Sequence, residues 1–331
     1  MLLPLGLALW ASAAPAVERP GVIIDTDLRS DVDDAGTLAL VNALADNGEC
    51  ELLGVVASQT GPHIVAAIDA INTYYGRGAV PVGLSPVDDQ RFDDHYAPVI
   101  GHPARYPSKQ SNATAPESTA LYRRLLRDAP DASVIIVVIG AQTCVQLLLD
   151  SPADHEGDGS IGVAGVQLVR DKVRLLVIMG GNFGDLGAQE HNINLDRASA
   201  DAIAARWPTP VLYCGFEIGA RIFTGAAMTD PARNPVAKAY ELYPAAGGRG
   251  RIAESCSFDQ ATAHAAIRGL HDSGVQLWEL SEPGRVSFPG GLSVFKPEPE
   301  GPHQFMKQKS SPEEAAKAIE ALMVQPPKRA M

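Results

Sequence analysis

The sequence has few cysteines, and few positive charges relative to its negative ones. Its four cysteines (Cys50, Cys144, Cys214 and Cys256) are far apart and form no CxxC pair, so they offer no metal-binding motif. We expect buried free thiols, with Cys214 and Cys256 the one pair to check for a bond. Lys and Arg number 27 against 39 Asp and Glu, a formal charge of −12. That charge, without a basic stripe, argues against a nucleic-acid partner.

Long apolar runs are absent after the start of the chain. Residues 1–16, MLLPLGLALWASAAPA, carry no charge and end in the small-residue pattern Ala14-Pro15-Ala16. This pattern predicts a secretory signal peptide and therefore export to the periplasm or the medium, although no Lys or Arg stands near Met1. The alternative is a wrongly assigned start. No later run approaches the ~18 apolar residues of a membrane-spanning helix, so we expect no contact with a membrane.

Internal repeats and Ser/Gly-rich linkers are also missing, which favours one domain over residues 17–331. Strands are predicted at 22–24, 51–57, 80–83, 133–139, 173–179 and 209–213, and helices at 33–46, 63–76, 116–128, from 140 and at 196–206. Strands that alternate with helices in this way predict an α/β fold, with one open, mainly parallel sheet and helices on both faces. Small C-terminal additions are predicted at 234–243 and 259–271 (helices), 275–280 (strand), 284–296 (hairpin) and 312–324 (helix). Residues 88–115 lack periodicity and predict a long loop that forms a lid or a site wall.

Five aspartates crowd the stretch Val22–Leu40, VIIDTDLRSDVDDAGTLAL; they are Asp25, Asp27, Asp31, Asp33 and Asp34. They follow a β-branched strand and precede a helical pattern. Ligands of open α/β sheets bind outside the carboxyl ends of the strands, where this loop should lie. Crowded carboxylates repel one another unless a cation lies among them, so we expect a hard divalent ion or a sugar site here. The alternative is a solvated acidic turn with helix-capping aspartates.

Other polar groups follow other predicted strands and should reach the same crevice. They are Ser58-Gln59-Thr60, Gly140 with Thr143, Gly180-Gly181-Asn182, and the loop that carries Glu190 and Asn192. A Glu with an Asn two residues on suits sugar hydroxyls, which both donate and accept, but turn and capping roles are equally open. Asp259 begins a predicted helix, where it is either a helix cap or part of the site.

Together these pieces resemble the inosine-uridine-type nucleoside hydrolase family. The similarity rests on DTD…DVDDA (25–35), AIDAINTYYGRG (67–78), GAQT (140–143), MGGN…EHNI (179–193), WPTPVLYCGFEIG (207–219), SFDQATA (257–263) and AIEALMVQPP (318–327). These motifs span nearly the whole chain after residue 20. The resemblance implies a Rossmann-like sheet, a homo-oligomer, and calcium-dependent hydrolysis of the N-glycosidic bond of ribonucleosides or related N-ribosides.

The resemblance also implies a role for particular residues. One Ca²⁺ would be held by the carboxylates of Asp27, Asp34 and Asp259 and by the main-chain oxygen of Thr143. Asp27 would also be the general base for the attacking water. The ribose hydroxyls would be bound by Asp33, Glu190 and Asn192, with Asn182 or Asp185 as a further contact.

The acid loop departs from the family pattern, because it contains about two extra residues before the Asp-Asp pair. Aligned on the following helix, Asp33 and Asp34 match the family and Asp31 is an additional carboxylate. Asp31 would then support the ligands from behind or be exposed. This alignment predicts that Asp27→Ala abolishes turnover and that Asp31→Ala leaves most of it.

A second departure concerns the leaving group. Many family members have a His before the C-terminal Asp, where it protonates the departing purine. Here that residue is Phe258, which would stack on the base or line the wall. Glu217 is the favoured replacement as proton donor, because it follows the strand at 209–213 and points at the same crevice. The lone histidines His63, His95, His102 and His191 are the other candidates.

Two other functions remain open at this stage. A HAD-type phosphatase also begins with a strand and DxD, but Arg29 stands where that family has Thr or Val, and no later Lys motif is found. The other is a Ca²⁺- and ribose- or nucleoside-binding protein that has lost turnover, which the loss of the His favours. Release of ribose separates it from a hydrolase.

Overall fold

The fold described here is that of a computed structural model, which covers residues 19–29, 31–87, 94–155, 162–184, 188–243, 252–269 and 276–328. The predicted signal peptide and Asp185 lie outside these ranges. Within them, no helix combines the length and the apolar character that a bilayer span requires.

A mixed sheet of ten strands forms the centre of the described chain, in the order β11-β10-β12-β6-β5-β4-β1-β2-β3, with β9 beside β12. The strands are β1 (Gly21–Thr26), β2 (Glu51–Ala57), β3 (Val82–Leu84), β4 (Val134–Val138), β5 (Val173–Met179), β6 (Val211–Cys214), β9 (Trp278–Leu280), β10 (Gly284–Ser287), β11 (Val294–Pro297) and β12 (His303–Gln308). The seven strands from β3 to β12 in this order run parallel, and β9, β10 and β11 pair antiparallel. The predicted mainly parallel sheet is confirmed.

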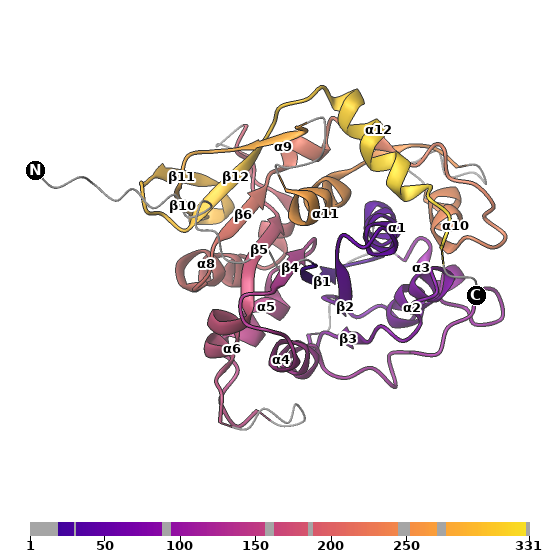
Figure 1. Ribbon diagram of the computed structural model, residues 1–331, viewed down its shortest axis with the longest axis horizontal. Helices are drawn as coiled ribbons and strands as arrows, with labels where there is room; N and C mark the ends of the chain where they lie inside the picture. The colour runs from indigo at the N-terminus through magenta and orange to yellow at the C-terminus, as the bar shows by residue number, and fades with distance from the viewer. Residues whose placement is uncertain are drawn as a thin grey trace, which may run out of the picture.

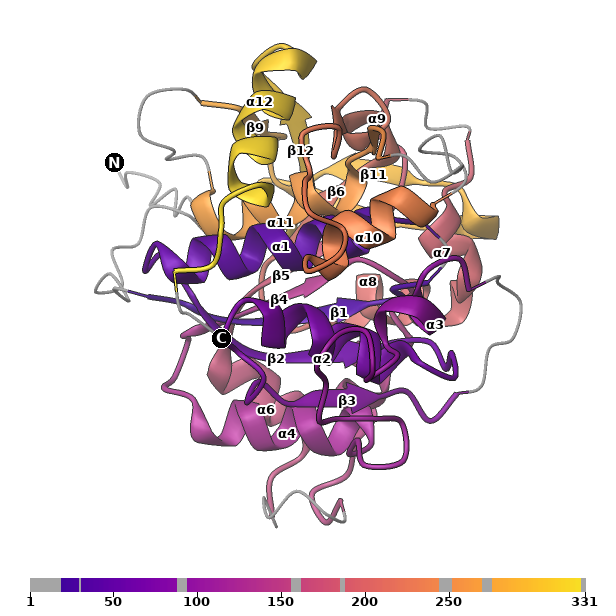
Figure 2. The same cartoon turned by 90° about the vertical axis from the view of Figure 1, so that its right-hand side faces the viewer.

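Helices cover both faces of this sheet, as expected (Figures 1 and 2). One face carries α1 (Asp33–Asp46), α2 (Ile64–Tyr74), α10 (Pro235–Leu242), α11 (Phe258–Arg268) and α12 (Pro312–Met323), and the other α4 (Ser118–Asp128), α5 (Thr143–Asp150), α6 (Gly165–Lys172) and α8 (Arg197–Arg206). Short elements complete the chain: α3 (Ala97–Ile100), α7 (His191–Leu195), α9 (Phe216–Gly219), the two-residue strands β7 (Phe223–Thr224) and β8 (Ser255–Cys256), and the 3-10 turn η1 (Pro289–Gly291). In Figure 2, α3 and α7, which follow the carboxyl ends of β3 and β5, lie on the right-hand side.

The predicted bounds of α1, β2 and β5 match the structure, whereas α6 and β12 were not predicted. In β12, HQFMKQ, the only apolar residues are the adjacent Phe305 and Met306, so neither an apolar run nor an alternating pattern marks a strand, and its pairing with β6 places it in the sheet. Only Leu168 and Val169 of α6 are buried apolar side chains, so its helical period is weak. Both elements owe their conformation to their neighbours.

Helix α1 is buried along nearly its whole length, between α2, α10, α11 and α12. Its sequence, DDAGTLALVNALAD, is mostly apolar after the first turn and is buried as far as Leu44, as expected for a helix in the interior of a protein. Gly36 allows close packing here, because a Cβ would lie 2.4 Å from the Gln260 side chain. The buried helix therefore fixes both of its ends, and the acid loop precedes its N-terminal end.

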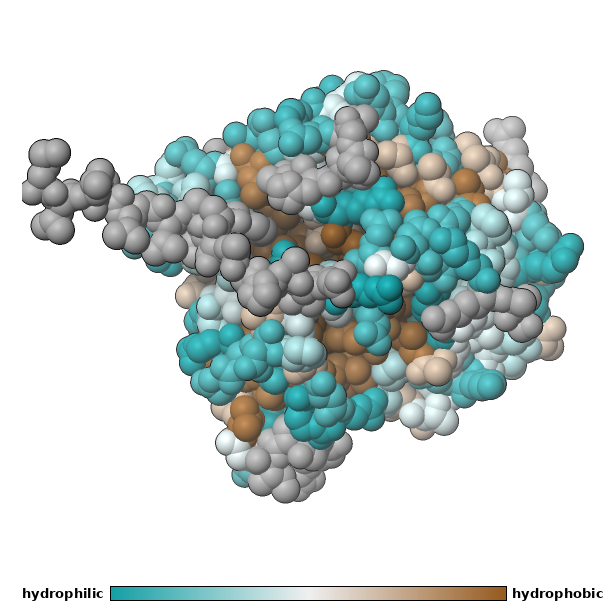
Figure 3. Space-filling model, viewed as in Figure 1, coloured by the Kyte–Doolittle hydropathy of each residue, from teal (hydrophilic) through white to brown (hydrophobic). Residues whose placement is uncertain are grey.

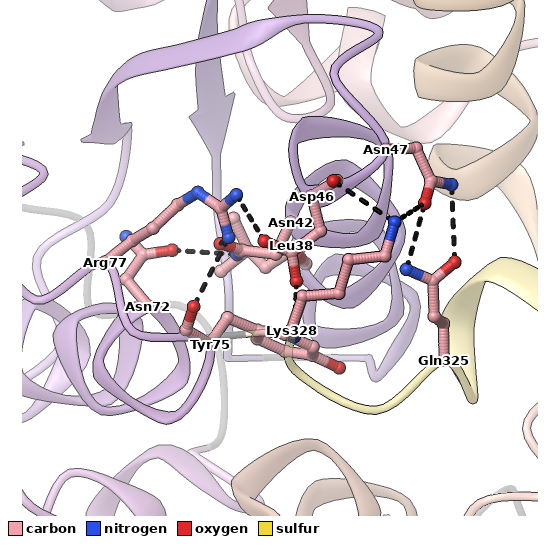
Figure 4. A network of polar contacts seen from close by, with 9 residues as sticks. All are labelled: Leu38, Asn42, Asp46, Asn47, Asn72, Tyr75, Arg77, Gln325 and Lys328. Atoms are coloured by element: carbon pink, nitrogen blue, oxygen red, sulfur yellow. Dashed lines mark hydrogen bonds and ion pairs between the residues drawn. The ribbon is translucent and has the colours of Figure 1, made fainter. Parts of the chain in front are cut away.

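The C-terminal end of α1 is held by a network of charged and amide groups (Figure 4). Asp46 forms an ion pair with Arg77 at 2.6 Å and also accepts the main-chain N–H of Lys328 at 2.9 Å. The side-chain amides of Asn47 and Gln325 bond each other in both directions, at 3.1 and 3.3 Å. The end of the described chain is thereby joined to the first crossover of the sheet.

The cysteines are free, as the sequence predicted. Cys214 is buried with its sulfur 3.9 Å from that of Met306, whereas the Cys256 sulfur lies 4.0 Å from the Ala220 carbonyl oxygen. On the face shown in Figure 3, hydrophilic residues cover most of the rim and hydrophobic residues reach the surface near the middle. The large apolar side chains exposed in the described chain are Val87, Phe216, Phe223, Val294 and Val324.

Candidate active site

Four predicted site carboxylates lie together beyond the end of β1. Asp27 follows the strand, and Asp33 and Asp34 form the first turn of α1. Asp259, from the second position of α11, joins them from a distant part of the sequence because α1 and α11 pack side by side. All four are buried, with at most 5% of any one exposed. The structure thus brings these four sequence-predicted residues together.

Asp31 also belongs to this group. Carboxylate oxygens of Asp31, Asp33 and Asp34 lie within 4.8 Å of one another, and Asp31 is half-buried. The sequence left Asp31 either exposed or behind the ligands. Its place in the group differs from that expectation, because the longer loop turns this carboxylate inward beside Asp33.

Asp34 has one oxygen satisfied and one without a partner. Its Oδ1 accepts the hydroxyl of Thr26, whereas its fully buried Oδ2 has no hydrogen-bond partner. The buried hydroxyl of Tyr96 also lacks a partner, and burial, followed by the charges of Asp34 and Asp31, raises its pKa. Buried carboxylate oxygens are nearly always paired, so an unpartnered one in a ring of acids indicates a place for a cation.

Asp33 joins the acid loop to α11. Its Oδ2 accepts the main-chain N–H groups of Phe258 at 3.2 Å and of Asp259 at 3.3 Å. These are unpaired donors of the first helical turn, which an anion at a helix N-terminus satisfies. Asp33 therefore positions Asp259, while its Oδ1 is not engaged by this cap.

Asp27 is held from β2 and from the loop after β4. Its Oδ2 accepts the side-chain N–H of Gln59 at 3.0 Å. Gly140 is required beside it, because a Cβ at that position would lie 2.9 Å from both Asp27 Oδ1 and the Ser58 hydroxyl. Three strand ends thus converge on one carboxylate.

The crowding of these acids raises their pKa values. Burial is the largest cause that raises the pKa of Asp27, Asp33, Asp34 and Asp259, and the charges of neighbouring carboxylates raise each of them further. At Asp27 the neighbours are Asp31, Asp25 and Glu190 in that order. Ionisation of these groups in the folded protein therefore costs free energy.

Asp25, the first of the five aspartates, lies behind the site. Burial raises its pKa to about 7, against which the hydrogen bond from the Tyr122 hydroxyl acts. That bond is 2.7 Å long and joins β1 to α4 on the opposite face of the sheet. Asp25 thus points away from the group that Asp33 and Asp34 form.

Glu190 and Asn192, predicted to bind ribose, are buried beside the same crevice. The Glu190 carboxylate accepts three main-chain N–H groups, from Gly181 at 3.2 Å, Asn192 at 2.9 Å and Ile193 at 3.0 Å, and so caps α7. Asn192 donates its amide to the carbonyls of Ile139 and Met179, each at 3.2 Å. The capping alternative that the sequence left open therefore describes the contacts of Glu190.

Thr143 begins α5, and its side chain is engaged away from the acids. Its hydroxyl donates to Asp196 Oδ2 at 2.7 Å, and Asp196 also caps α8 through the Ser199 N–H at 3.1 Å. This contact fixes the first turn of α5, whose main-chain oxygen at Thr143 is the predicted fourth ligand.

Glu217 and Asn182 lie after β6 and β5. Burial raises the pKa of Glu217, and its Oε2 accepts the main-chain N–H of Phe183 at 3.0 Å, which acts in the opposite direction. The main-chain N–H of Asn182 donates to the Ser293 hydroxyl at 2.8 Å. Gly181 has φ +87°, a left-handed conformation that favours glycine between these two strand ends.

Of the four candidate histidines, His95 is placed next to the acid loop. Its main-chain N–H donates to the Arg29 carbonyl at 3.4 Å, and its ring packs edge-on against Tyr243 at 5.9 Å. Burial and the charges of Asp31 and Asp33 raise the pKa of Tyr243, which places Tyr243 near the same acids. His63 precedes α2, His102 accepts a loop N–H, and His191 begins α7.

Sequence reasoning missed Tyr96 and Tyr243 as neighbours of the site. Tyr96 follows Asp94-His95 in the loop predicted to wall the site, which was the one available signal, whereas nothing polar marks Tyr243. Both reach the acids through the packing of α3 and α10 onto α1 and α2. Gln59 was noted at the end of β2 without a role, and its contact with Asp27 supplies one.

The donor set fits a hard divalent cation. Carboxylate oxygens are the preferred ligands of Ca²⁺, and at least one of them here is buried and unpartnered. Cysteine and histidine sulfur or nitrogen ligands, which soft transition metals prefer, are not among the grouped residues.

A family model described as inosine-uridine preferring nucleoside hydrolase matches residues 22–277. The chain belongs to this family. The match covers the acid loop, the strand ends and Asp259, and it favours the hydrolase-type fold over the phosphatase alternative. None of the curated proteins matches the chain.

Solved structures of nucleoside hydrolases share the fold. The plant enzyme PpNRh1 superposes with a TM-score of 0.63 at 17% identity, over 93% of this chain and 99% of that one. A purine-preferring ribonucleoside hydrolase from Gardnerella vaginalis gives 0.62 at 17% identity, over 92% and 99%. The type III effector XopQ, solved with adenosine diphosphate ribose, gives 0.64 at 17% identity, over 92% of each chain. The same fold thus occurs in enzymes and in an effector.

Proposed function

We propose that this protein is a calcium-dependent N-ribohydrolase, which cleaves a ribosyl C–N bond with water to give ribose and a free base. The observation that carries the proposal is the group of buried acids, with the unpartnered Oδ2 of Asp34, at the carboxyl edge of the sheet. The family match supports the reaction class. Calcium-free activity of the protein would contradict the proposal.

Asp27, Asp34 and Asp259 would hold the cation, with the main-chain oxygen of Thr143 and with Asp31 as an additional ligand. A bound Ca²⁺ supplies positive charge that stabilises the ionised acids and lowers the pKa of an adjacent water. Asp31 enters this set because its oxygen lies within 4.8 Å of those of Asp33 and Asp34.

Asp27 would take the proton of the attacking water. Its raised pKa in the metal-free protein suits a base that the cation holds ionised at neutral pH. Asp33, Glu190, Asn192 and Asn182 would bind the ribose hydroxyls. Glu190 already accepts three N–H groups, so its contribution would be to orient α7 and Asn192 as well as to accept from a hydroxyl.

The leaving group would meet Phe258 and Glu217. Glu217 is the sequence-based candidate for proton donor, and the desolvation that raises its pKa favours that role. The Phe183 N–H instead favours the carboxylate form. Glu217→Gln separates these roles, because only loss of a donor slows neutral nucleosides selectively.

The first experiment is a reducing-sugar assay on the purified protein with Ca²⁺, against a panel of purine and pyrimidine nucleosides. We expect ribose release that EDTA abolishes and Ca²⁺ restores. Asp27→Ala should lower kcat by at least about 1,000-fold, because it removes both a base and a ligand. Lys109→Ala, in an exposed loop position, is the control and should retain activity.

A second candidate function is a protein that binds ribosides through a cation without turnover. It is favoured by the similarity to XopQ, an effector whose structure contains adenosine diphosphate ribose. Calorimetry with Ca²⁺ and adenosine diphosphate ribose would show binding in both cases. Binding without ribose release from any riboside would establish this function instead.

We also propose export and a homo-oligomeric assembly. Export rests on the signal-peptide pattern of residues 1–16, and the assembly on the family resemblance. Cell fractionation with N-terminal sequencing tests the first, and light scattering of the purified protein tests the second.

A further inference from the structure

Two aromatic rings are stacked at the edge of the acid group. Phe216 and Phe258 have ring centroids 5.1 Å apart and an interplanar angle of 26°. Phe216 is 44% exposed, which is unusual for so large an apolar side chain in the described structure. An exposed stacked pair presents a ring face to solvent or to a ligand.

The main chain ties this pair to the site. The N–H of Phe258 donates to Asp33 Oδ2 at 3.2 Å, so one ring begins at a residue in direct contact with the acid group. The N–H of Phe216 donates to the Gly181 carbonyl at 2.9 Å, at the carboxyl end of β5. Both residues therefore stand at the sheet edge where Asp27 and Glu190 also lie.

The charges around the pair are negative. Asp33 contacts the main chain of Phe258 and Asp259, and carboxylate oxygens of Asp31, Asp33 and Asp34 lie within 4.8 Å of one another. With Asp27, these five acidic side chains can carry more charge than one divalent cation neutralises. Glu217 follows Phe216 directly, with its carboxylate accepting a main-chain N–H. Ring faces are also the negative part of an aromatic quadrupole.

These surroundings disfavour a leaving group that becomes negative. When a C1′–N bond breaks, the electron pair stays on nitrogen, so a neutral base departs as an anion unless it is protonated. A phenyl ring donates no proton. A quaternised heterocycle departs as a neutral molecule and needs none, and its ring charge is attracted to aromatic faces and to carboxylates.

We propose that the preferred substrates are N-ribosides with a positively charged heterocycle, such as N-ribosyl pyridinium compounds, and that Phe216 and Phe258 bind that ring. This inference rests on the proposed hydrolase function. In the reaction a bond forms between the water oxygen and C1′, and the C1′–N bond breaks. One water proton passes to Asp27, the other stays on the new ribose hydroxyl, and the heterocycle leaves neutral with the electron pair.

The test separates ring recognition from the intrinsic reactivity of the substrate. Dissociation constants are measured for 1-methylnicotinamide, a cation, and for nicotinamide, its neutral counterpart, by calorimetry in the presence of Ca²⁺ and ribose. In parallel, ribose release is measured from nicotinamide riboside, inosine and uridine. We expect the cation to bind at least about tenfold more tightly than nicotinamide, and nicotinamide riboside to have the highest kcat/KM.

Phe216→Leu keeps an apolar side chain but removes the ring face. It should weaken binding of 1-methylnicotinamide about fivefold and leave nicotinamide nearly unchanged. Phe223→Leu is the matched control, because Phe223 is also exposed, at 46%, and lines a groove with α12 that includes none of the candidate site residues. It should alter neither constant.

The outcomes keep the two proposals apart. If inosine or uridine is hydrolysed while both probes bind equally, the inference is overturned and the hydrolase function stands. If no riboside releases ribose, the hydrolase function fails, and the calorimetric preference still decides whether the rings form a cation subsite. Selective loss of the neutral nucleosides in Glu217→Gln would reveal a proton donor and overturn the inference.

Discussion

The two ends of helix α1 treat carboxylates in opposite ways. At the C-terminal end, Asp46 is buried with Arg77 at 2.6 Å and the Lys328 N–H at 2.9 Å, so its charge is compensated within the chain. At the N-terminal end, Asp33 and Asp34 lie among further acids, and Asp34 Oδ2 has no partner. The charge of the same residue type is compensated within the chain at one end and not at the other, where we propose that a cation binds.

This difference teaches how a site can be recognised without a bound ligand. A buried charge is costly unless it is paired, and proteins that fold stably usually pair it. At the Asp46 end of α1 the chain supplies such a partner, so it can pair a buried charge where only stability is needed. The uncompensated end is therefore better explained by function than by poor packing.

The largest effects are expected for a substitution at the N-terminal end of α1. Asp34→Asn should lower affinity for Ca²⁺ by at least about 100-fold, since even the loss of an outer-shell partner can cost that much. It should also raise the Tm of the metal-free protein, because it removes a buried uncompensated charge. Calorimetry of Ca²⁺ binding and thermal melts in EDTA measure the two effects.

Asp46→Asn is the matched control at the other end of the helix and should leave Ca²⁺ affinity unchanged. Asp31→Asn should lower the affinity about tenfold, as a half-buried additional ligand. If Asp31→Asn has no effect, Asp31 is not a ligand, and the sequence-based expectation for this residue is correct. If Asp34→Asn lowers Tm in EDTA, the contrast between the ends fails.

The second prediction concerns the compensated end. Arg77→Met should lower the free energy of unfolding by about 3–5 kcal/mol, because Asp46 then remains buried without its ion-pair partner. Ca²⁺ affinity should not change, since the network lies at the far end of α1. Urea denaturation in EDTA and in Ca²⁺ checks both points, and a parallel loss of Ca²⁺ binding would show that the two ends are coupled.

The third prediction is a pH dependence of the metal-free protein. The raised folded-state pKa values mean that the folded state binds more protons than the unfolded chain above about pH 4. Stability is therefore greatest in acid with respect to these groups, and it falls as pH rises through their folded pKa values, which for Asp25 is about 7.

Ca²⁺ should reverse this trend, because it binds the ionised carboxylates. At a concentration about 100-fold above its Kd it should add about 2.7 kcal/mol, a rise in Tm of roughly 4 °C for a chain of this length. The increase should be larger at pH 8 than at pH 5, measured by differential scanning fluorimetry. An increase that does not vary with pH would mean that these acids are not the ligands.

The smallest effect is expected for the exposed part of the C-terminal network. Lys328→Ala removes side-chain bonds to the Asp46 carbonyl at 3.3 Å and to Asn47 at 2.8 Å, but keeps the main-chain N–H that bonds Asp46. Because the side chain is exposed, the loss of unfolding free energy should stay below about 1 kcal/mol. A larger loss would show that the Lys328 side chain stabilises the fold more than an exposed group should.

Much of the site could be predicted from the sequence because its motifs are local. The aspartates stand directly between a β-branched strand and an apolar helix, so their place at the carboxyl edge of the sheet follows from the order of elements alone. Asp259 could be assigned only through a resemblance, since nothing near it distinguishes a ligand from a helix cap. The capping bonds of Glu190 were one of two open alternatives, whereas the inward position of Asp31 was neither of the two that the sequence offered.

The sequence by itself determined the α/β alternation, the acid loop, the excess of negative charge and the replacement of a family His by Phe258. It did so because strand and helix periods and charge density are properties of adjacent residues. Tertiary structure alone decided which oxygens remain unpartnered, that Asp33 caps α11, and that Phe258 stacks on Phe216, forty-two positions before it. These contacts join residues far apart in the chain, and only the packing of α1, α9 and α11 brings them together.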